Sequence, residues 1–151
     1  MKQLITAAIL FFLIKISSFL NFTCEYGNND DWWIAKNIYQ CNVNGNFSVK
    51  TSEESLIMSI SGSHSTYYTN NDVKAMIVQN FSVHYFLTGM ETFFKNLELI
   101  DISQCQIREI HQIHFKPFPK LRAIILSDNA IEVLQNGLFD YNLNLEMIWI
   151  S

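Results

Sequence analysis

Two histidines, His111 and His114, come nearest to a chemical site by residue type and spacing in this 151-residue chain. Side chains three residues apart can share one face of a helix and bind one metal ion, but no third ligand of a suitable kind lies near them. His64 and His84, with scattered Asp and Ser, form no recognisable set of nucleophile, base and orienting group. The sequence therefore predicts a solvated loop at His111 and His114, and no enzyme, metal site or cofactor.

Cys105 is a further candidate nucleophile, but it lies inside a repeated pattern that predicts its burial. Residues 97–107 align with residues 121–131, 24 positions later, and the pattern starts again at Leu145. Apolar residues recur at the first, fourth, sixth and eleventh positions, while Cys105 and Asn129 hold the ninth. The alternation at the fourth and sixth positions predicts a strand. A buried Asn or Cys suits the turn that follows, because Asn can satisfy backbone groups there and Cys is small.

These copies must be packed against one another, because a single copy cannot bury its own apolar face. We expect a parallel sheet on a concave face and the return segments on a convex face. A degenerate copy begins at Val73, so residues 73–151 are assigned to one degenerate, two complete and one truncated copy. Residues 24–72 lack the pattern and hold an Asn-Gly pair that indicates a hairpin, and we assign them to an N-terminal cap.

Because the chain stops within a strand motif, we expect a fragment of a longer protein whose uncovered C-terminal end self-associates.

The N-terminus indicates secretion. Lys2 precedes an apolar run from Leu4 to Ile14, as in a signal peptide, to which we assign residues 1–18. The alternative is an uncleaved membrane anchor, because the apolar stretch continues to Phe22, although Lys15 would be costly inside a spanning helix.

In a secreted protein, cysteines can form disulfides and asparagines in sequons can carry glycans. Cys24 and Cys41 flank a tract outside the repeats and are predicted to form a disulfide, which leaves Cys105 as a buried free thiol. Asn46 and Asn80 each begin an Asn-Phe-Ser sequon and are candidate glycosylation sites. A third sequon, at Asn21, lies close to the predicted cleavage point.

Composition excludes two classes of partner. The net charge of −4, without a basic cluster, argues against nucleic acid. The chain has no glycine-rich loop for a phosphate-bearing metabolite. With 49% hydrophobic and 16% charged residues it has the composition of a folded domain.

The predicted concave face offers the clearest candidate for binding. The third and fifth positions of each copy project away from the core and form two columns, which read Ala75, Leu99, Ala123 and Met147, and Ile77, Asp101, Ile125 and Trp149. With strands about 4.8 Å apart, these columns form a largely apolar stripe about 14 Å wide. Exposed apolar patches mark interaction sites, so we expect a protein partner there, with Met147 and Trp149 as anchors.

Four local segments carry a resemblance to a known family. They are Phe93-Phe94-Lys95-Asn96-Leu97, the Cys105 position, Lys116-Pro117-Phe118-Pro119 and Asn136-Gly137-Leu138-Phe139. With the 24-residue pattern they resemble extracellular leucine-rich repeat proteins, similar to the secreted ones abundant in insects. The resemblance implies an α/β solenoid with a small disulfide-bridged cap, and a non-enzymatic module that binds an extracellular protein in recognition or immunity. The alternatives are a structural or adhesive protein of the matrix or cell surface, and an ectodomain fragment of a membrane receptor.

Overall fold

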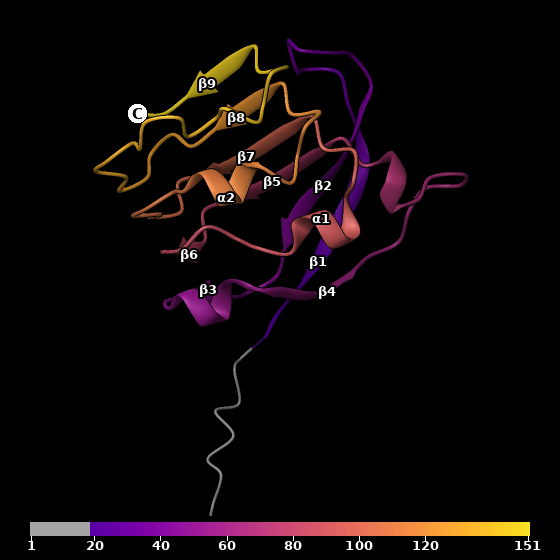
Figure 1. Cartoon of the computed structure of the whole chain (residues 1–151). Coiled ribbons are helices and arrows are strands. Elements are labelled where there is room, and N and C mark those ends of the chain that lie inside the picture. The colour runs from indigo at the N-terminus through magenta and orange to yellow at the C-terminus, as the bar shows by residue number, and fades with distance from the viewer. Residues whose placement is uncertain (1–18) are drawn as a thin grey trace, which may run out of the picture.

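A computed structural model describes residues 19–151 of the chain, so the predicted signal peptide, residues 1–18, lies outside the described residues. Seven strands form one sheet in the order β4-β1-β2-β5-β7-β8-β9, and β3 and β6 form a second, two-stranded sheet (Figure 1). The strands are β1 (Leu20–Asn29), β2 (Ile38–Asn44), β3 (Ser48–Val49), β4 (Ile57–Ser61), β5 (Ala75–Gln79), β6 (Ser82–Val83), β7 (Leu99–Ser103), β8 (Ala123–Ile125) and β9 (Met147–Trp149). The helices are α1 (Met90–Phe93) and α2 (Gln112–Phe115), with 3-10 turns η1 (Ser52–Ser55) and η2 (Asn70–Asp72).

The α/β solenoid predicted from the sequence is wrong as a fold class. The described residues form a mostly β protein with a mixed sheet, in which β1 runs antiparallel to β2 while the other pairs are parallel. Its two α-helices have four residues each. The return segments cannot extend them, because Gly89 at the N-cap of α1 has a φ of 81° and Pro117 follows directly after the C-cap of α2.

The 24-residue spacing nevertheless sets the register of the parallel strands. Ala75 of β5 pairs with Leu99 of β7, Leu99 with Ala123 of β8, and Ala123 with Met147 of β9. In the copy that starts at Leu121, the predicted core positions Leu121, Ile124 and Leu126 are fully buried, and Ile131 is half-buried.

The two faces of the large sheet differ in what covers them. On the face that we call the back face, Met76, Ile100 and Ile124 pack into the main core with large rings such as Phe94 and Phe115. The opposite face, which we call the front face, carries a smaller cluster of Ile34, Ile38, Ala75, Ile77, Leu99 and Ala123.

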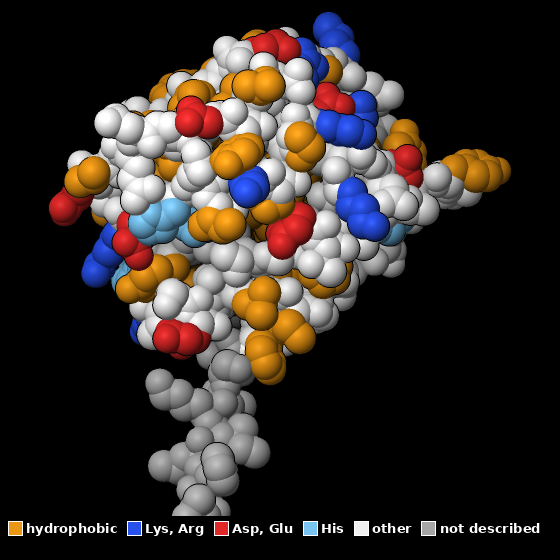
Figure 2. All heavy atoms as spheres, viewed as in Figure 1, with side chains coloured by type: hydrophobic (Ala, Val, Ile, Leu, Met, Phe, Trp, Pro, Cys, Tyr) orange, Lys and Arg blue, Asp and Glu red, His pale blue; other side chains and the backbone are white. Residues whose placement is uncertain are grey.

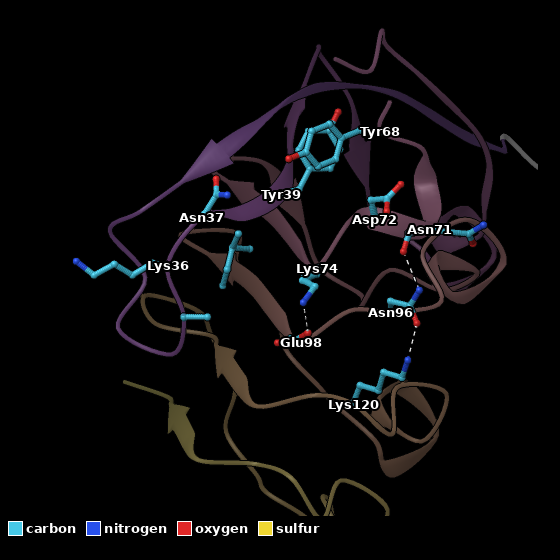
Figure 3. A pocket seen from close by; sticks show the side chains of 12 residues that line it. Lys36, Asn37, Tyr39, Tyr68, Asn71, Asp72, Lys74, Asn96, Glu98 and Lys120 are labelled. Atoms are coloured by element: carbon cyan, nitrogen blue, oxygen red, sulfur yellow. Dashed lines mark hydrogen bonds and ion pairs between the residues drawn. The ribbon is translucent and has the colours of Figure 1, made fainter. Parts of the chain in front are cut away.

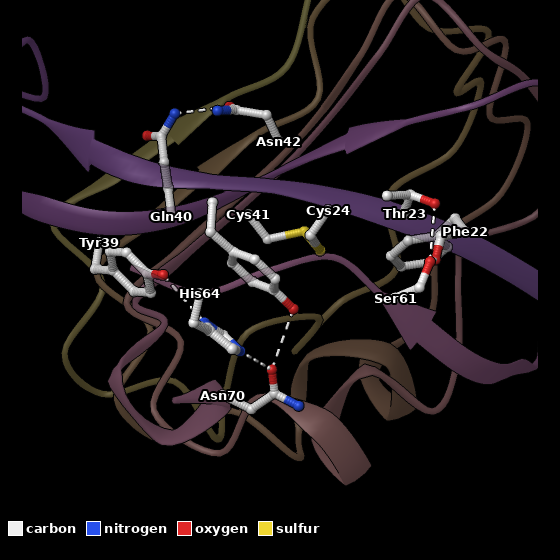
Figure 4. The surroundings of a disulfide bond; sticks show 11 residues. Phe22, Thr23, Cys24, Tyr39, Gln40, Cys41, Asn42, Ser61, His64 and Asn70 are labelled. Carbon is white, nitrogen blue, oxygen red and sulfur yellow. Dashed lines mark hydrogen bonds between the residues drawn. A yellow bond between two sulfur atoms is a disulfide. The ribbon is translucent and has the colours of Figure 1, made fainter. Parts of the chain in front are cut away.

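The N-terminal region, residues 24–72, continues the same sheet. The predicted disulfide is present, with Cys24 of β1 and Cys41 of β2 bonded at a Cα separation of 5.0 Å (Figure 4), and Cys105 is the buried free thiol of the described residues. The hairpin predicted at residues 44–45 is wrong, since this turn connects β2 to β3 in the other sheet, while the antiparallel pair β1 and β2 is joined by residues 30–37.

An aromatic and polar network supports the disulfide from the side of the 62–72 loop (Figure 4). Tyr39 Oη lies 3.0 Å from His64 Nδ1, and His64 Nε2 lies 2.9 Å from Asn70 Oδ1, which suits an imidazole that donates from Nε2. Tyr26 also donates to Asn70 Oδ1 at 3.1 Å, and burial raises the pKa of Tyr26 to about 12. The loop is therefore tied to β1 and β2 through side chains.

Candidate partner-binding face

The front face is mostly closed, which corrects the prediction of an exposed stripe. Ala75, Leu99 and Ala123 are fully buried, and Ile77, Asp101 and Ile125 are no more than 8% exposed. Only the two residues on β9 remain accessible: Met147 is half-buried and Trp149 is 56% exposed.

The segment that connects β1 to β2, residues 30–37, explains much of this burial, and we call it the covering segment. Its Ile34 packs into the front-face cluster with Ile38, and Trp32 packs against the same cluster. Alanine at positions 75 and 123 leaves the room that these large side chains need. The periodicity of the repeats does not contain this information, because the covering segment lies outside them.

Hydrogen bonds fix the covering segment at both ends. Trp32 Nε1 donates to Gln40 Oε1 at 2.7 Å, and Gln40 Nε2 donates to Asn42 Oδ1 at 2.7 Å, so the indole is held on β2. The backbone N–H of Asn37 donates to Asp30 Oδ1 at 2.7 Å and closes the segment on itself. These contacts indicate that the covering segment is a fixed part of the fold and not a mobile flap.

Asp101, in the middle of the front face, is a buried carboxylate that accepts hydrogen bonds from two neutral side chains. Gln79 Nε2 donates to its Oδ2 and Ser103 Oγ donates to its Oδ1, both at 2.7 Å. Burial raises the pKa of Asp101, while the hydrogen bonds from Ser103 and Gln79 oppose that rise. The carboxylate therefore carries an electrostatic cost in the folded state at neutral pH.

The substitution Asp101→Asn should raise the free energy of unfolding at neutral pH by about 1 kcal/mol. A carboxyl group with a raised pKa in the folded state stabilises the fold below its unfolded pKa, and that contribution is lost as the pH rises through the folded pKa. The neutral amide keeps an acceptor for Ser103 and removes this loss. Urea denaturation at about pH 4 and about pH 7 should show the gain at the higher pH only.

The substitution Asp72→Asn is the matched control for this experiment. Asp72 is exposed, and hydrogen bonds from Thr69 lower its pKa, so its removal should act in the opposite direction at neutral pH. A D101N protein that is less stable than the wild type at neutral pH would show that the ionised carboxylate stabilises the fold, and would contradict the prediction.

A row of alternating charges runs along the rim where the parallel strands begin. Lys74 Nζ lies 2.9 Å from Glu98, Glu98 lies 3.6 Å from Arg122, and Arg122 Nε lies 2.6 Å from Glu146. Hydrogen bonding to Glu146 raises the pKa of Arg122, and the same contact lowers the pKa of Glu146. The sequence contains this row at 24-residue spacing, but an interpretation based on apolar positions overlooked it.

A polar groove of about 400 Å³ lies beside this row (Figure 3). Tyr68, Lys74, Asn96, Glu98 and Lys120 contribute to its walls. Its polar groups are largely paired, since Lys120 donates to Asn96 Oδ1 at 2.8 Å and Lys74 pairs with Glu98. Figure 2 shows acidic and basic side chains interspersed over the visible face, without a basic patch. Its charged lining residues are three lysines, Lys36, Lys74 and Lys120, and two carboxylates, Asp72 and Glu98, so the excess of positive charge is small.

The ninth-position residues stabilise the turns after the strands. Asn129 Nδ2 donates to the carbonyl oxygens of Ile102 and Leu126 at 2.7 and 3.0 Å, and its Oδ1 accepts from the N–H of Ile107 at 2.9 Å. The Cys105 thiol donates to the carbonyl oxygen of Ser103 at 3.1 Å, and burial raises its pKa, so it is a poor nucleophile. Both residues are structural.

Asn142 performs a similar task that the sequence interpretation missed. It is 3% exposed and donates from Nδ2 to the carbonyl oxygens of Phe115 and Phe118, both at 2.9 Å. Its burial could not be predicted from the repeated pattern, because Asn142 lies in a return segment, three residues after Phe139 and outside the strand motif.

The two histidines of the 111–114 segment contact other groups of the protein. His114 Nδ1 accepts the backbone N–H of His111 at 3.1 Å, and its ring stacks on Phe86 with the centroids 4.9 Å apart. Burial, with His111 nearby, lowers the pKa of His114 to about 4. Among the described residues no group of three or more potential ligands could hold a metal ion. His111 is thus the N-cap of α2 and His114 its third residue, and both are half-buried, unlike the solvated loop predicted.

Comparison with known proteins gives no relative: no family model, no curated protein and no solved structure matches the chain. Within the part of the chain that the structure describes, no helix is both long and apolar enough to span a bilayer.

Proposed function

We propose that this chain is an extracellular, non-enzymatic module that binds a protein partner on the accessible end of its front face. The observation that carries the proposal is the 56% exposure of Trp149, whose backbone is paired with β8 in strand β9. Large aromatic side chains of this kind are enriched among the residues that dominate binding energy. Met147, half-buried beside the front-face cluster, extends the same apolar surface.

The surroundings of Trp149 support a site for a protein. The rim charges Arg122 and Glu146 lie at the start of the same strands, so an apolar centre is flanked by polar groups, as in protein interfaces. The covering segment adds Trp33, which is 56% exposed although its neighbour Trp32 packs on the front face. The paired charges and the two structural ninth-position residues give no support to catalysis.

A structural or adhesive role is the second candidate, and the edge of β9 favours it. Met147 and Trp149 direct backbone groups toward β8, since the Met147 N–H donates to Arg122 and the Trp149 carbonyl accepts from Leu126. Ile148, which is 46% exposed, therefore presents its backbone groups outward. A second copy placed antiparallel about Ile148 would pair these groups reciprocally and set Met147 opposite Trp149 of the other copy.

A photo-cross-linking residue at position 149 should capture one discrete protein when the full chain is exposed to extracellular fluid. The matched control is the same residue at position 67, where Tyr67 is 97% exposed on the far loop. Capture at both positions, or at neither, would contradict the proposal. A cross-linked product that contains two copies of this chain would favour the adhesive role instead.

A further inference from the structure

Three Asn-Phe-Ser/Thr tripeptides that are distant in sequence lie side by side in the structure. They start at Asn21, Asn46 and Asn80. The ring centroids of Phe22 and Phe47 are 6.0 Å apart, and those of Phe47 and Phe81 are 4.3 Å apart, so the three central side chains form one stack. Pairing of β3 with β6 aligns the second and third tripeptides, with Ser48 opposite Ser82.

The stack turns the phenylalanines inward and the flanking residues outward. Phe22 is buried in the main core, and Phe47 and Phe81 are half-buried against it. All three asparagines before these rings are exposed; at Asn21, within β1, this follows because neighbouring side chains of a strand point to opposite sides. Each tripeptide is therefore held by its ring and presents its amide at the surface.

The three amides differ in what they contact. Within the described residues, the side chains of Asn46 and Asn80 form no hydrogen bond. Both lie in turns: Asn80 has a φ of 63°, and Asn46 follows Gly45, which has a φ of 123°. Asn21 instead lies within β1, and its Oδ1 accepts a hydrogen bond from Ser59 Oγ of β4 at 2.6 Å.

We propose that Asn46 and Asn80 carry N-linked glycans when the chain passes through the secretory pathway, and that Asn21 does not. The inference rests on the extracellular location in the proposed function. The reaction forms a bond between the amide Nδ2 and C1 of a sugar carried on a lipid diphosphate. The bond from C1 to the diphosphate breaks, the lipid diphosphate leaves with the electron pair, and the amide loses one proton. No oxidant or reductant takes part.

The glycans would lie over the small sheet of β3 and β6 and away from the proposed binding surface. In Figure 1 these strands lie at the opposite side of the molecule from β9. A bulky polar chain on each asparagine would cover the half-buried rings of Phe47 and Phe81, while Trp149 would stay accessible. The glycosylated side is thus distinct from the side that we propose for a partner.

The test is to produce the full chain in secretory cells and measure glycosidase-sensitive gel mobility, with peptide mass spectrometry to locate each glycan. Two mobility steps are expected. N46Q and N80Q should each remove one step, while N21Q should remove none. Ser48→Ala should also remove the Asn46 step, whereas Ser48→Thr, which keeps the sequon, should retain it. An exported chain without a glycan on Asn46 or Asn80, or with one on Asn21, would overturn the inference.

A second chain, whose residues 1–18 are replaced by a strong signal sequence, separates this inference from the proposed function. If only the second chain is exported and is modified at Asn46 and Asn80, the glycosylation inference holds and the extracellular location fails. If both chains are exported and neither asparagine is modified, the extracellular location holds and the glycosylation inference fails.

Discussion

Replacing Cys24 and Cys41 together by alanine should lower the free energy of unfolding by about 3 kcal/mol. The bridge spans a sequence separation of 17 residues, and this loop contains the whole covering segment. Without the bridge, the unfolded chain gains conformational freedom that the oxidised chain lacks, which is the source of the loss in the chain-entropy model. Urea denaturation of the oxidised wild type and the double variant measures the difference directly.

Two controls isolate the bridge in this experiment. Reduced wild-type protein should match the double variant, and mass spectrometry of the unreduced protein should find Cys24 linked to Cys41. The substitution Cys105→Ala removes a buried thiol that takes no part in the bridge, so the linkage between Cys24 and Cys41 should stay intact. A peptide that links Cys41 to Cys105 would contradict the observed pairing.

Leu126→Ala should cost between about 2 and 5 kcal/mol of unfolding free energy. Leu126 is fully buried in the main core directly after β8, so truncation removes its transfer free energy and leaves a cavity. Leu143→Ala makes the same chemical change at a side chain that is 89% exposed and should alter stability by less than about 0.5 kcal/mol. Equal costs at the two positions would contradict the assignment of Leu126 to the core.

The 24-residue pattern predicted the strands and their register because these depend on short-range alternation. Ile100, Ile102, Ile124 and Leu126 alternate with residues of the front face, and each strand then aligns with its counterpart one period away. The disulfide was also predictable, since Cys24 and Cys41 flank a tract outside the repeats. Asn129 was predictable as a buried turn residue from the same pattern.

The closed front face and the mixed sheet were not predictable from periodicity. Ile34 covers Ala75 and Ala123 across more than 40 positions of sequence, and nothing local in either segment specifies that contact. The antiparallel course of β1 and β2 follows from the return of the chain through residues 30–37, which contain no recognisable turn pair. The predicted stripe is buried because Ile34 and Trp32, which lie outside the repeats, pack on the front face.

The position of β1 in the sheet has a consequence for how the protein is made. β1 pairs with β2 and with β4, so all its strand partners are present once residue 61 has been synthesised. The N-terminal unit can then complete its pairing while later residues are still being added, and it offers β2 as a template for β5. Strands β7, β8 and β9 would add in order of synthesis, each pairing with residues that lie one 24-residue period earlier in the chain. Folding should therefore proceed from the N-terminus during translation, and a stalled nascent chain released after residue 103 should already protect β1 from proteolysis.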